Sequence, residues 1–399
     1  MPGRLLTVAV LSAALAAHAS PGAQQPPAPA DLPDEPLVQG PVFRLGVSLV
    51  QIDAVVTDRK GRHVTTLGPD DFEVRQDGRP QRIVAVSYVR ADDGWQDTSG
   101  LPPVASAPRS LHEAARTIAL VVDDLRMSFE SVYHTRRALQ QFVDRELLAD
   151  DLVALVTTSA APGTSVRFTY SRPQLRAAVS RLRFSLHGFP TTSVFDAVSA
   201  PDAWPFSDPF ALHRERTTAE AVLQRIEEIA TLLPAEGGRK AIVLVSEGFP
   251  VFGHAWSLDT VNSAMRRLVD RANRAGVVIY AVDPRGLVNT GPSAADAVSP
   301  SGARALASRR DAVLRETQDG LRYIAGGTGG FAVINSNDIR RALRRIVDDQ
   351  AGYYLIGYEP EAGTFGPDSA RDFRRVKVRL TRKGLKIRAR TGFYARPTE

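Results

Sequence analysis

The sequence predicts an α/β fold: a doubly wound, mostly parallel sheet accompanied by a small β-sandwich-like part. Three largely apolar, β-branched runs, 117–122, 240–245 and 277–282, alternate with segments of helical periodicity, as buried parallel strands do. The flanks, 42–91 and 351–399, instead contain short runs in which apolar and polar residues alternate, which is typical of antiparallel strands. A chain of 399 residues with 43% hydrophobic residues has enough apolar material for both parts.

The chain begins with a segment typical of a secretory signal peptide, residues 1–19. Arg4 precedes an apolar run, and Ala17-His18-Ala19 offers the small residues that a signal peptidase reads. The run is shorter than the about 20 residues of a membrane span, so we expect cleavage and no transmembrane helix in the mature chain. An uncleaved anchor is the alternative. We therefore expect export to the periplasm or the cell exterior.

Two polar stretches that contain proline, 20–41 and 92–113, are predicted linkers on either side of the first β segment, 42–91. Within that segment Asp77-Gly78 is a strong hairpin dipeptide. We expect this segment and the C-terminal β segment, 351–399, to build one β-domain, with the α/β part inserted between them.

The α/β part, 114–350, is predicted from alternating strand and helix patterns. In chain order, the patterns predict strands at 117–122, 152–156, 166–170, 240–245 and 277–282, and helices at 131–148, 174–182, 214–233 and 258–275. The glycine run 326–330 predicts a tight helix-to-strand turn, because it lacks the lysine and hydroxyl residue of a phosphate loop. The segment 284–309, rich in Ala, Ser and Gly, is expected to be a lid or disordered.

Acidic residues follow three of the predicted parallel strands. The strands end in Asp123-Asp124, Ser246-Glu247-Gly248 and Asp283. Because the carboxyl ends of parallel strands meet at one edge of a sheet, we expect these side chains to converge there. Three acidic strand ends at one edge indicate a candidate cation site.

The α/β part resembles a von Willebrand factor type A domain. The chain as a whole is similar to exported bacterial proteins that are related to that family. The resemblance covers roughly 42–396 and implies a doubly wound α/β domain that binds partners at the carboxyl ends of its strands. The segments that carry the resemblance are Asp71-Phe72-Glu73-Val74, Val121-Val122-Asp123-Asp124, Thr192-Ser193-Val194-Phe195-Asp196-Ala197, Val245-Ser246-Glu247-Gly248, 324–330 and Tyr353-Tyr354-Leu355-Ile356-Gly357-Tyr358.

The family's adhesion site holds a divalent cation through a D-x-S-x-S loop, a Thr and an Asp. Asp123 matches the first Asp, and Thr192 matches the Thr. Leu125 and Met127 occupy the two serine positions and cannot ligate a hard cation, and Glu247 stands where the second Asp is usual.

Two interpretations of this departure remain open. In the first, Asp124 and Ser128 substitute for the missing serines, so that Asp123, Asp124, Ser128, Thr192 and Glu247 bind Mg²⁺ or Mn²⁺. In the second, Asp123 and Asp124 cap the following helix and accept hydrogen bonds from loop amides, and no cation is bound.

An aromatic segment lies between the predicted helices at 174–182 and 214–233. It carries Phe189, Trp204 and Phe206 among prolines and serines. Aromatic anchors beside a polar face are typical of binding hot spots, so these three residues are candidate partner contacts. Packing of their rings onto the domain is the alternative.

The positive charge is concentrated near the C-terminus. The net charge is +6, but 371–396 alone carries eleven basic residues and one acid, hence +10, which leaves −4 for the rest. Apolar and cationic residues alternate at 376–380 and 385–390 around a turn at 382–384, which predicts a β-hairpin. We expect its apolar face to complete the β-domain and its cationic face to be solvated or to contact an anionic envelope surface. Nucleic-acid binding is not expected of an exported protein.

Together these patterns favour an exported, non-enzymatic module that binds a protein or envelope ligand with the carboxyl ends of its parallel strands. The chain has no cysteine, no H-E-x-x-H pair and no G-x-S-x-G setting around Ser246, which removes the usual thiol, zinc and serine hydrolase sites. One alternative is a secreted metal-assisted hydrolase that uses Asp123, Asp124 and Glu247, although the D-x-D-x-[TV] motif is missing. The other is a purely structural envelope component.

Overall fold

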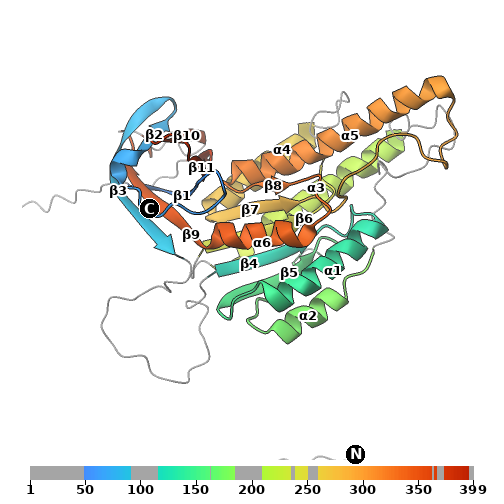
Figure 1. Cartoon of the computed structure of the whole chain (residues 1–399), viewed down its shortest axis with the longest axis horizontal. Coiled ribbons are helices and arrows are strands. Elements are labelled where there is room, and N and C mark those ends of the chain that lie inside the picture. The colour runs from blue at the N-terminus through green and yellow to red at the C-terminus, as the bar shows by residue number, and fades with distance from the viewer. Residues whose placement is uncertain are drawn as a thin grey trace, which may run out of the picture. The chain divides into compact units, whose positions relative to one another are not determined.

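The computed structural model describes residues 49–90, 116–161, 163–184, 209–234, 239–249, 259–361, 364–365 and 373–394, which form two sheets (Figure 1). One sheet is parallel, with the strand order β5-β4-β6-β7-β8, and the other is antiparallel and curled, with the order β11-β1-β9-β3-β2-β10-β12. The predicted fold class is therefore confirmed. Among the described residues, no helix is long and apolar enough to cross a membrane.

Two strands of the parallel sheet, β4 and β7, are buried from end to end, and β5 and β6 are buried at most positions, which explains their nearly continuous apolar sequences. Their bounds are β4 (Arg116–Val122), β5 (Asp151–Thr157), β6 (Arg239–Val245), β7 (Val277–Val282) and β8 (Ala332–Val333). The predicted strand at 166–170 is replaced by a single bridge between Thr169 and Val153, since Thr169 exchanges both backbone hydrogen bonds with Val153 and its neighbours do not continue the ladder.

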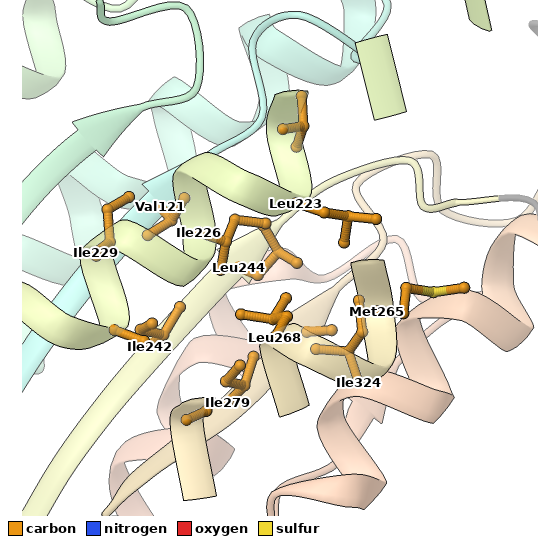
Figure 2. Packing of buried hydrophobic residues seen from close by; sticks show 14 of the residues in the cluster. Val121, Leu223, Ile226, Ile229, Ile242, Leu244, Met265, Leu268, Ile279 and Ile324 are labelled. Atoms are coloured by element: carbon orange, nitrogen blue, oxygen red, sulfur yellow. The ribbon is translucent and has the colours of Figure 1, made fainter. Parts of the chain in front are cut away.

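Helices cover both faces of the parallel sheet. One face packs on α1 (Phe129–Arg145), α2 (Arg172–Ser180) and α6 (Ile339–Gln350). The other face packs on α3 (Pro209–Leu232), α4 (Asp259–Arg274) and α5 (Pro300–Gly327). Figure 2 shows this second core, where Ile226, Leu268 and Ile324 of the three helices meet Leu244 and Ile279 of the sheet.

The segment 284–309, expected to be a lid or disordered, is partly helical and is anchored. Ser299 caps α5 by accepting a hydrogen bond from the Gly302 N–H, and Pro300 occupies the first turn, where proline favours a helix start. The loop before α5 is held by Asp296, whose carboxylate pairs with Arg310 at 2.7 Å, with both side chains almost fully buried. The alanine-rich sequence therefore reflects a helix rather than mobility.

Strands from both ends of the chain interleave in the antiparallel sheet. The bounds are β1 (Val50–Thr57), β2 (Phe72–Gln76), β3 (Arg79–Arg90), β9 (Gly352–Glu359), β10 (Phe373–Leu380), β11 (Lys386–Ala389) and β12 (Gly392–Tyr394). Strand β9 lies between β1 and β3, so the α/β part is inserted between two sets of strands of one sheet. Tyr354 of β9 ties the core to the loop after β1: its hydroxyl donates to Val64 O and accepts from Leu67 N, both at 2.9 Å.

The predicted C-terminal hairpin is wrong. Strand β10 pairs with β2 and β12, whereas β11 pairs with β1 on the other side of the strand order. The turn after β10 is tied to a short 3-10 helix (Pro69–Asp71), because Thr381 N donates to Asp71 O at 3.0 Å. The curl of the sheet lets a short link carry the chain from β10 to the distant strand β11.

The cationic face is also divided. Arg375, Lys377 and Arg379 of β10 are exposed, as the alternation predicts. Arg388 of β11 instead turns inward and pairs with the buried Asp349 of α6, and Arg390 donates to the carbonyl of Asn273 in α4. These two arginines connect the antiparallel sheet to the helices of the α/β part, so they are not part of a solvated face.

Candidate functional site: the carboxyl edge of the parallel sheet

The parallel register brings the three strand ends side by side. Val122, Val245 and Val282 are aligned across β4, β6 and β7, and the ladder continues one residue further: Asp123 N donates to Val245 O at 2.9 Å, and Ser246 N donates to Val282 O at 3.1 Å. The predicted convergence of these residues is thus a direct result of strand pairing. We call this surface, with its loops, the carboxyl-edge face.

Asp123 is fully buried at the centre of this face. Its Oδ1 accepts a hydrogen bond from the Thr158 hydroxyl at 2.9 Å, and its Oδ2 accepts one from the Ser246 hydroxyl at 2.6 Å. Burial raises the pKa of Asp123 to about 6, against the opposing effect of the Arg126 guanidinium and these two hydroxyls. Both carboxylate oxygens are therefore bonded within the protein.

Asp124, the next residue, fastens the loop that follows β5. Its Oδ1 accepts from Ser159 N at 2.9 Å, and its Oδ2 accepts from the Ser159 hydroxyl at 2.5 Å. The Thr158 hydroxyl lies 3.3 Å from Oδ1 and thus connects the two aspartates. Asp124 thus accepts a hydrogen bond from a loop amide, as the second interpretation of the sequence predicts, but Ser128, rather than Asp123 or Asp124, caps the following helix.

Glu247 and Ser128 meet at the start of α1. Ser128 N donates to Glu247 Oε1 at 2.7 Å, and the Ser128 hydroxyl caps the helix by accepting from Ser131 N at 3.3 Å. The additional methylene of glutamate lets the carboxylate reach the helix N-terminus, where the helix dipole favours a negative charge. Both side chains therefore have structural partners.

Arg126 places a cation inside the carboxyl-edge face. Its side chain is only 4% exposed; Nη2 pairs with Glu215 Oε1 of α3 at 2.5 Å, and Nε donates to Gly248 O at 3.2 Å. The guanidinium also lies over the Phe249 ring, 5.4 Å from its centroid. Burial acts to lower the pKa of Arg126, but the carboxylates of Glu215, Asp123 and Glu247 hold it above its usual value.

Asp283 forms a separate group. Arg285 binds both of its carboxylate oxygens, at 2.8 and 2.9 Å, and Gln318 Nε2 donates to it at 3.0 Å. The three acidic strand ends therefore reach one edge, but Asp283 has an arginine of its own and does not join the Asp123 cluster.

Among the residues that the structure describes, no group of three or more His, Asp or Glu side chains is arranged to hold a metal ion. Met127, at a serine position of the adhesion motif, is fully buried in the apolar core, and the Arg126 guanidinium pairs with Glu215 and interacts electrostatically with Asp123 and Glu247. Thr192 lies outside the described residues, as do Phe189, Trp204 and Phe206.

Two large apolar side chains are exposed on loops of the carboxyl-edge face. Phe129, at the start of α1, is 63% exposed, and Leu287, in the loop after β7, is 70% exposed. Phe129 follows β4 and Leu287 follows β7, and these two strands are separated by β6 alone. Exposed apolar residues over a fixed polar network are typical of interaction surfaces.

Sequence reasoning missed four members of the network: Arg126, Thr158, Glu215 and the hydroxyl of Ser246. Thr158 and Ser246 follow the ends of β5 and β6, so the strand-end rule that selected Asp123 could also have found them. Arg126 and Glu215 had no such signal, because their pairing depends on how α3 packs against the loop after β4.

A comparison with protein-family models finds no match, and neither does a comparison with curated protein sequences. Among solved structures, an aerotolerance-related membrane protein from Bacteroides fragilis is similar at 14% identity and a TM-score of 0.34, over 58% of this chain and 98% of that one. The human COPII-coat protein Sec24c is similar at 10% identity and a TM-score of 0.30, over 71% of this chain and 44% of that one. Likenesses this weak carry no argument about this chain.

Proposed function

We propose that this chain is an exported, non-enzymatic interaction module of the von Willebrand factor type A kind, carried on a split β-domain. It binds a protein or envelope partner with its carboxyl-edge face. The observation that carries the proposal is the pair of exposed apolar side chains, Phe129 and Leu287, on two segments that polar contacts hold in place: Ser128 N donates to Glu247, and Leu287 N donates to Asn337. The signal peptide at 1–19 supports export to the periplasm or the cell exterior.

In this proposal the face works without a resident Mg²⁺ or Mn²⁺. Arg126 supplies the positive charge that a cation would bring, and it does so from a buried position between Glu215 and Asp123. The face is therefore preorganised before the partner arrives, which lowers the entropic cost of association. Phe189, Trp204 and Phe206 remain proposed partner contacts on the ground of their sequence alone.

The experiment compares capture of envelope proteins by the immobilised mature chain and by its variants. We expect wild-type protein to retain a saturable partner in buffer that contains EDTA, and the Phe129→Ala/Leu287→Ala double variant to lose it. Leu148→Ala is the matched control, because Leu148 is 50% exposed just before β5, at the opposite edge of the sheet.

The rival functions give different outcomes. Equal retention by all variants, or no saturable partner, would favour the structural envelope component over an interaction module. Hydrolysis of p-nitrophenyl phosphate that depends on added Mg²⁺ or Mn²⁺ and is lost in Asp123→Ala would favour the metal-assisted hydrolase.

A further inference from the structure

A basic groove of about 750 Å³ lies between the turn after β1 and helix α6, and the loop between β8 and α6 contributes Ser336 and Asp338 to its lining. Eight arginine and lysine side chains and four carboxylates line it, which gives a net charge of +4 with His63 neutral. Burial lowers the pKa of His63, and the nearby Arg239 and Arg388 act in the same direction, so the neutral form is favoured. The volume lies within the range of about 300–1,000 Å³ that is usual for ligand pockets.

Three of the four carboxylates of the groove have local partners. Asp58 accepts from Arg62 Nε at 2.8 Å, and Asp338 caps α6 by accepting from Arg341 N at 2.8 Å. Asp349 is held by Arg388 and by the Tyr280 hydroxyl, which donates to it at 2.7 Å. Only one of these contacts, that of Asp349 with Arg388, is an ion pair with a cation of the lining, so the groove keeps a clear excess of positive charge.

Six cations of the groove have no ion-pair partner among the residues that the structure describes. They are Arg59, Lys60, Arg340, Arg341, Arg345 and Lys386, of which Arg345 lies over the Phe331 ring, 4.2 Å from its centroid. Two come from the turn after β1, three from α6 and one from β11, so separate elements present them to the same space. Cations that converge without counter-charges in a concave site are complementary to an anionic ligand.

We propose that this groove binds an acidic peptide segment of a partner protein. Unpaired arginines favour carboxylates, because the planar guanidinium can donate two parallel hydrogen bonds to them. The groove lining contains no Phe, Tyr or Trp ring on which a nucleotide base could stack. The carboxylates of Asp338 and Asp348, both exposed in the lining, oppose a uniformly charged phosphate chain. They leave room for a peptide whose acids are interspersed with neutral residues.

Fluorescence anisotropy with a labelled peptide of alternating glutamate and glycine, titrated with the full mature chain, tests this proposal. We expect saturable binding that weakens as salt is added, because exposed charges are screened. Arg340→Glu/Arg341→Glu should weaken binding by at least about tenfold, which corresponds to about 1.4 kcal/mol. Glutamates are tolerated in the first turn of a helix, so α6 should persist.

Lys377→Glu/Arg379→Glu is the matched control, because it changes the net charge equally on the exposed face of β10. It should weaken binding by less than about twofold, the modest effect of distant screened charges. An equal loss in both double variants, or an absence of saturation with wild-type protein, would overturn the proposal. So would tighter binding of phosphatidylglycerol vesicles or duplex DNA than of the peptide. Neither Phe129 nor Leu287 lines the groove, so the Phe129→Ala/Leu287→Ala double variant should bind the peptide as wild type does, and a failure of this proposal can be told from a failure of the proposed function.

Discussion

Arg126 is the residue on which the carboxyl-edge face depends most. It is almost fully buried, and it neutralises Glu215, which is itself 5% exposed. Arg126→Met should lower the free energy of unfolding by about 3–5 kcal/mol, because it removes one partner of a buried ion pair. Urea denaturation at neutral pH measures this difference.

Arg176→Met is the matched control for Arg126→Met, since Arg176 pairs with Asp144 at 2.6 Å but both side chains are about half exposed. An exposed pair of this kind contributes about 0–1 kcal/mol. A similar small loss in both variants would mean that Arg126 is not the cation that holds the face together.

Asp123 makes the stability of the fold depend on pH. Its pKa is raised to about 6 by burial, whereas the unfolded chain releases this proton near the ordinary value of 3.8. Between these values the folded state binds more protons, so the contribution of Asp123 to the free energy of unfolding falls as pH rises. The free energy of unfolding of wild-type protein, relative to that of Asp123→Asn, should therefore fall by up to about 3 kcal/mol between pH 4 and pH 7.

Urea denaturation of wild-type protein and Asp123→Asn at several pH values measures that loss. Other titrating groups are common to both proteins and cancel in the difference. A difference in stability that stays constant from pH 4 to pH 7 would show that the Asp123 carboxylate is not penalised by burial.

The residues at strand ends were predictable, and the role of each was less so. Asp123, Glu247 and Asp283 were selected because parallel strands end at one edge, and the structure places all three there. Their partners depend on tertiary packing: Glu247 turns to Ser128 N rather than to a cation, and Asp283 turns to Arg285. The proposed metal ligation by Asp123, Asp124, Ser128, Thr192 and Glu247 stays untested.

At the scale of elements, α5 shows how closely a helix approaches the carboxyl-edge loops. A Cβ on Gly320 would lie 2.3 Å from Phe249 O, so only glycine fits where α5 meets the loop after β6. Gly320→Ala should therefore lower the free energy of unfolding by about 1–3 kcal/mol through overpacking. Thermal unfolding followed by circular dichroism measures the change.

Gly326→Ala, in the same helix, should have the opposite effect. A Cβ at Gly326 meets nothing within 4 Å, so alanine should stabilise α5 by up to about 1 kcal/mol through its better helix propensity. If both variants were destabilised equally, the close approach of α5 to Phe249 would not be the cause.

The elements were easiest to predict where their sequence period was long and continuous. The three apolar runs of the parallel sheet are β4, β6 and β7 within one or two residues, because burial on both faces demands apolar residues throughout. The pairing of β10 and β11 could not be predicted in this way. Local alternation and the turn at 382–384 fit a hairpin, but β10 pairs with β2 and β11 pairs with β1, strands that lie far away in the sequence.

At the scale of the whole molecule, the charge is distributed over surfaces with different roles. The net charge of +6 combines an exposed β10 face, the inward-facing Arg388 and Arg390, and the groove beside α6. Composition located the excess of positive charge near the C-terminus. It could not show which of these cations are exposed and which turn inward, because that depends on contacts between β11 and the helices. The net charge therefore says little about the partner of the carboxyl-edge face.

The dissociation constant for the protein that the mature chain retains from envelope extract tests the partner-binding face most directly. Phe129→Ala/Leu287→Ala should raise it by at least about tenfold, or about 1.4 kcal/mol, in Mg²⁺ and in EDTA alike, since truncating hot-spot residues costs this much or more. Leu148→Ala should leave the dissociation constant within about twofold of the wild-type value, because a surface substitution at the opposite edge of the sheet has little effect on this face. A partner that EDTA releases, or one that the double variant binds as tightly as wild type, would contradict a cation-independent partner face at the carboxyl edge.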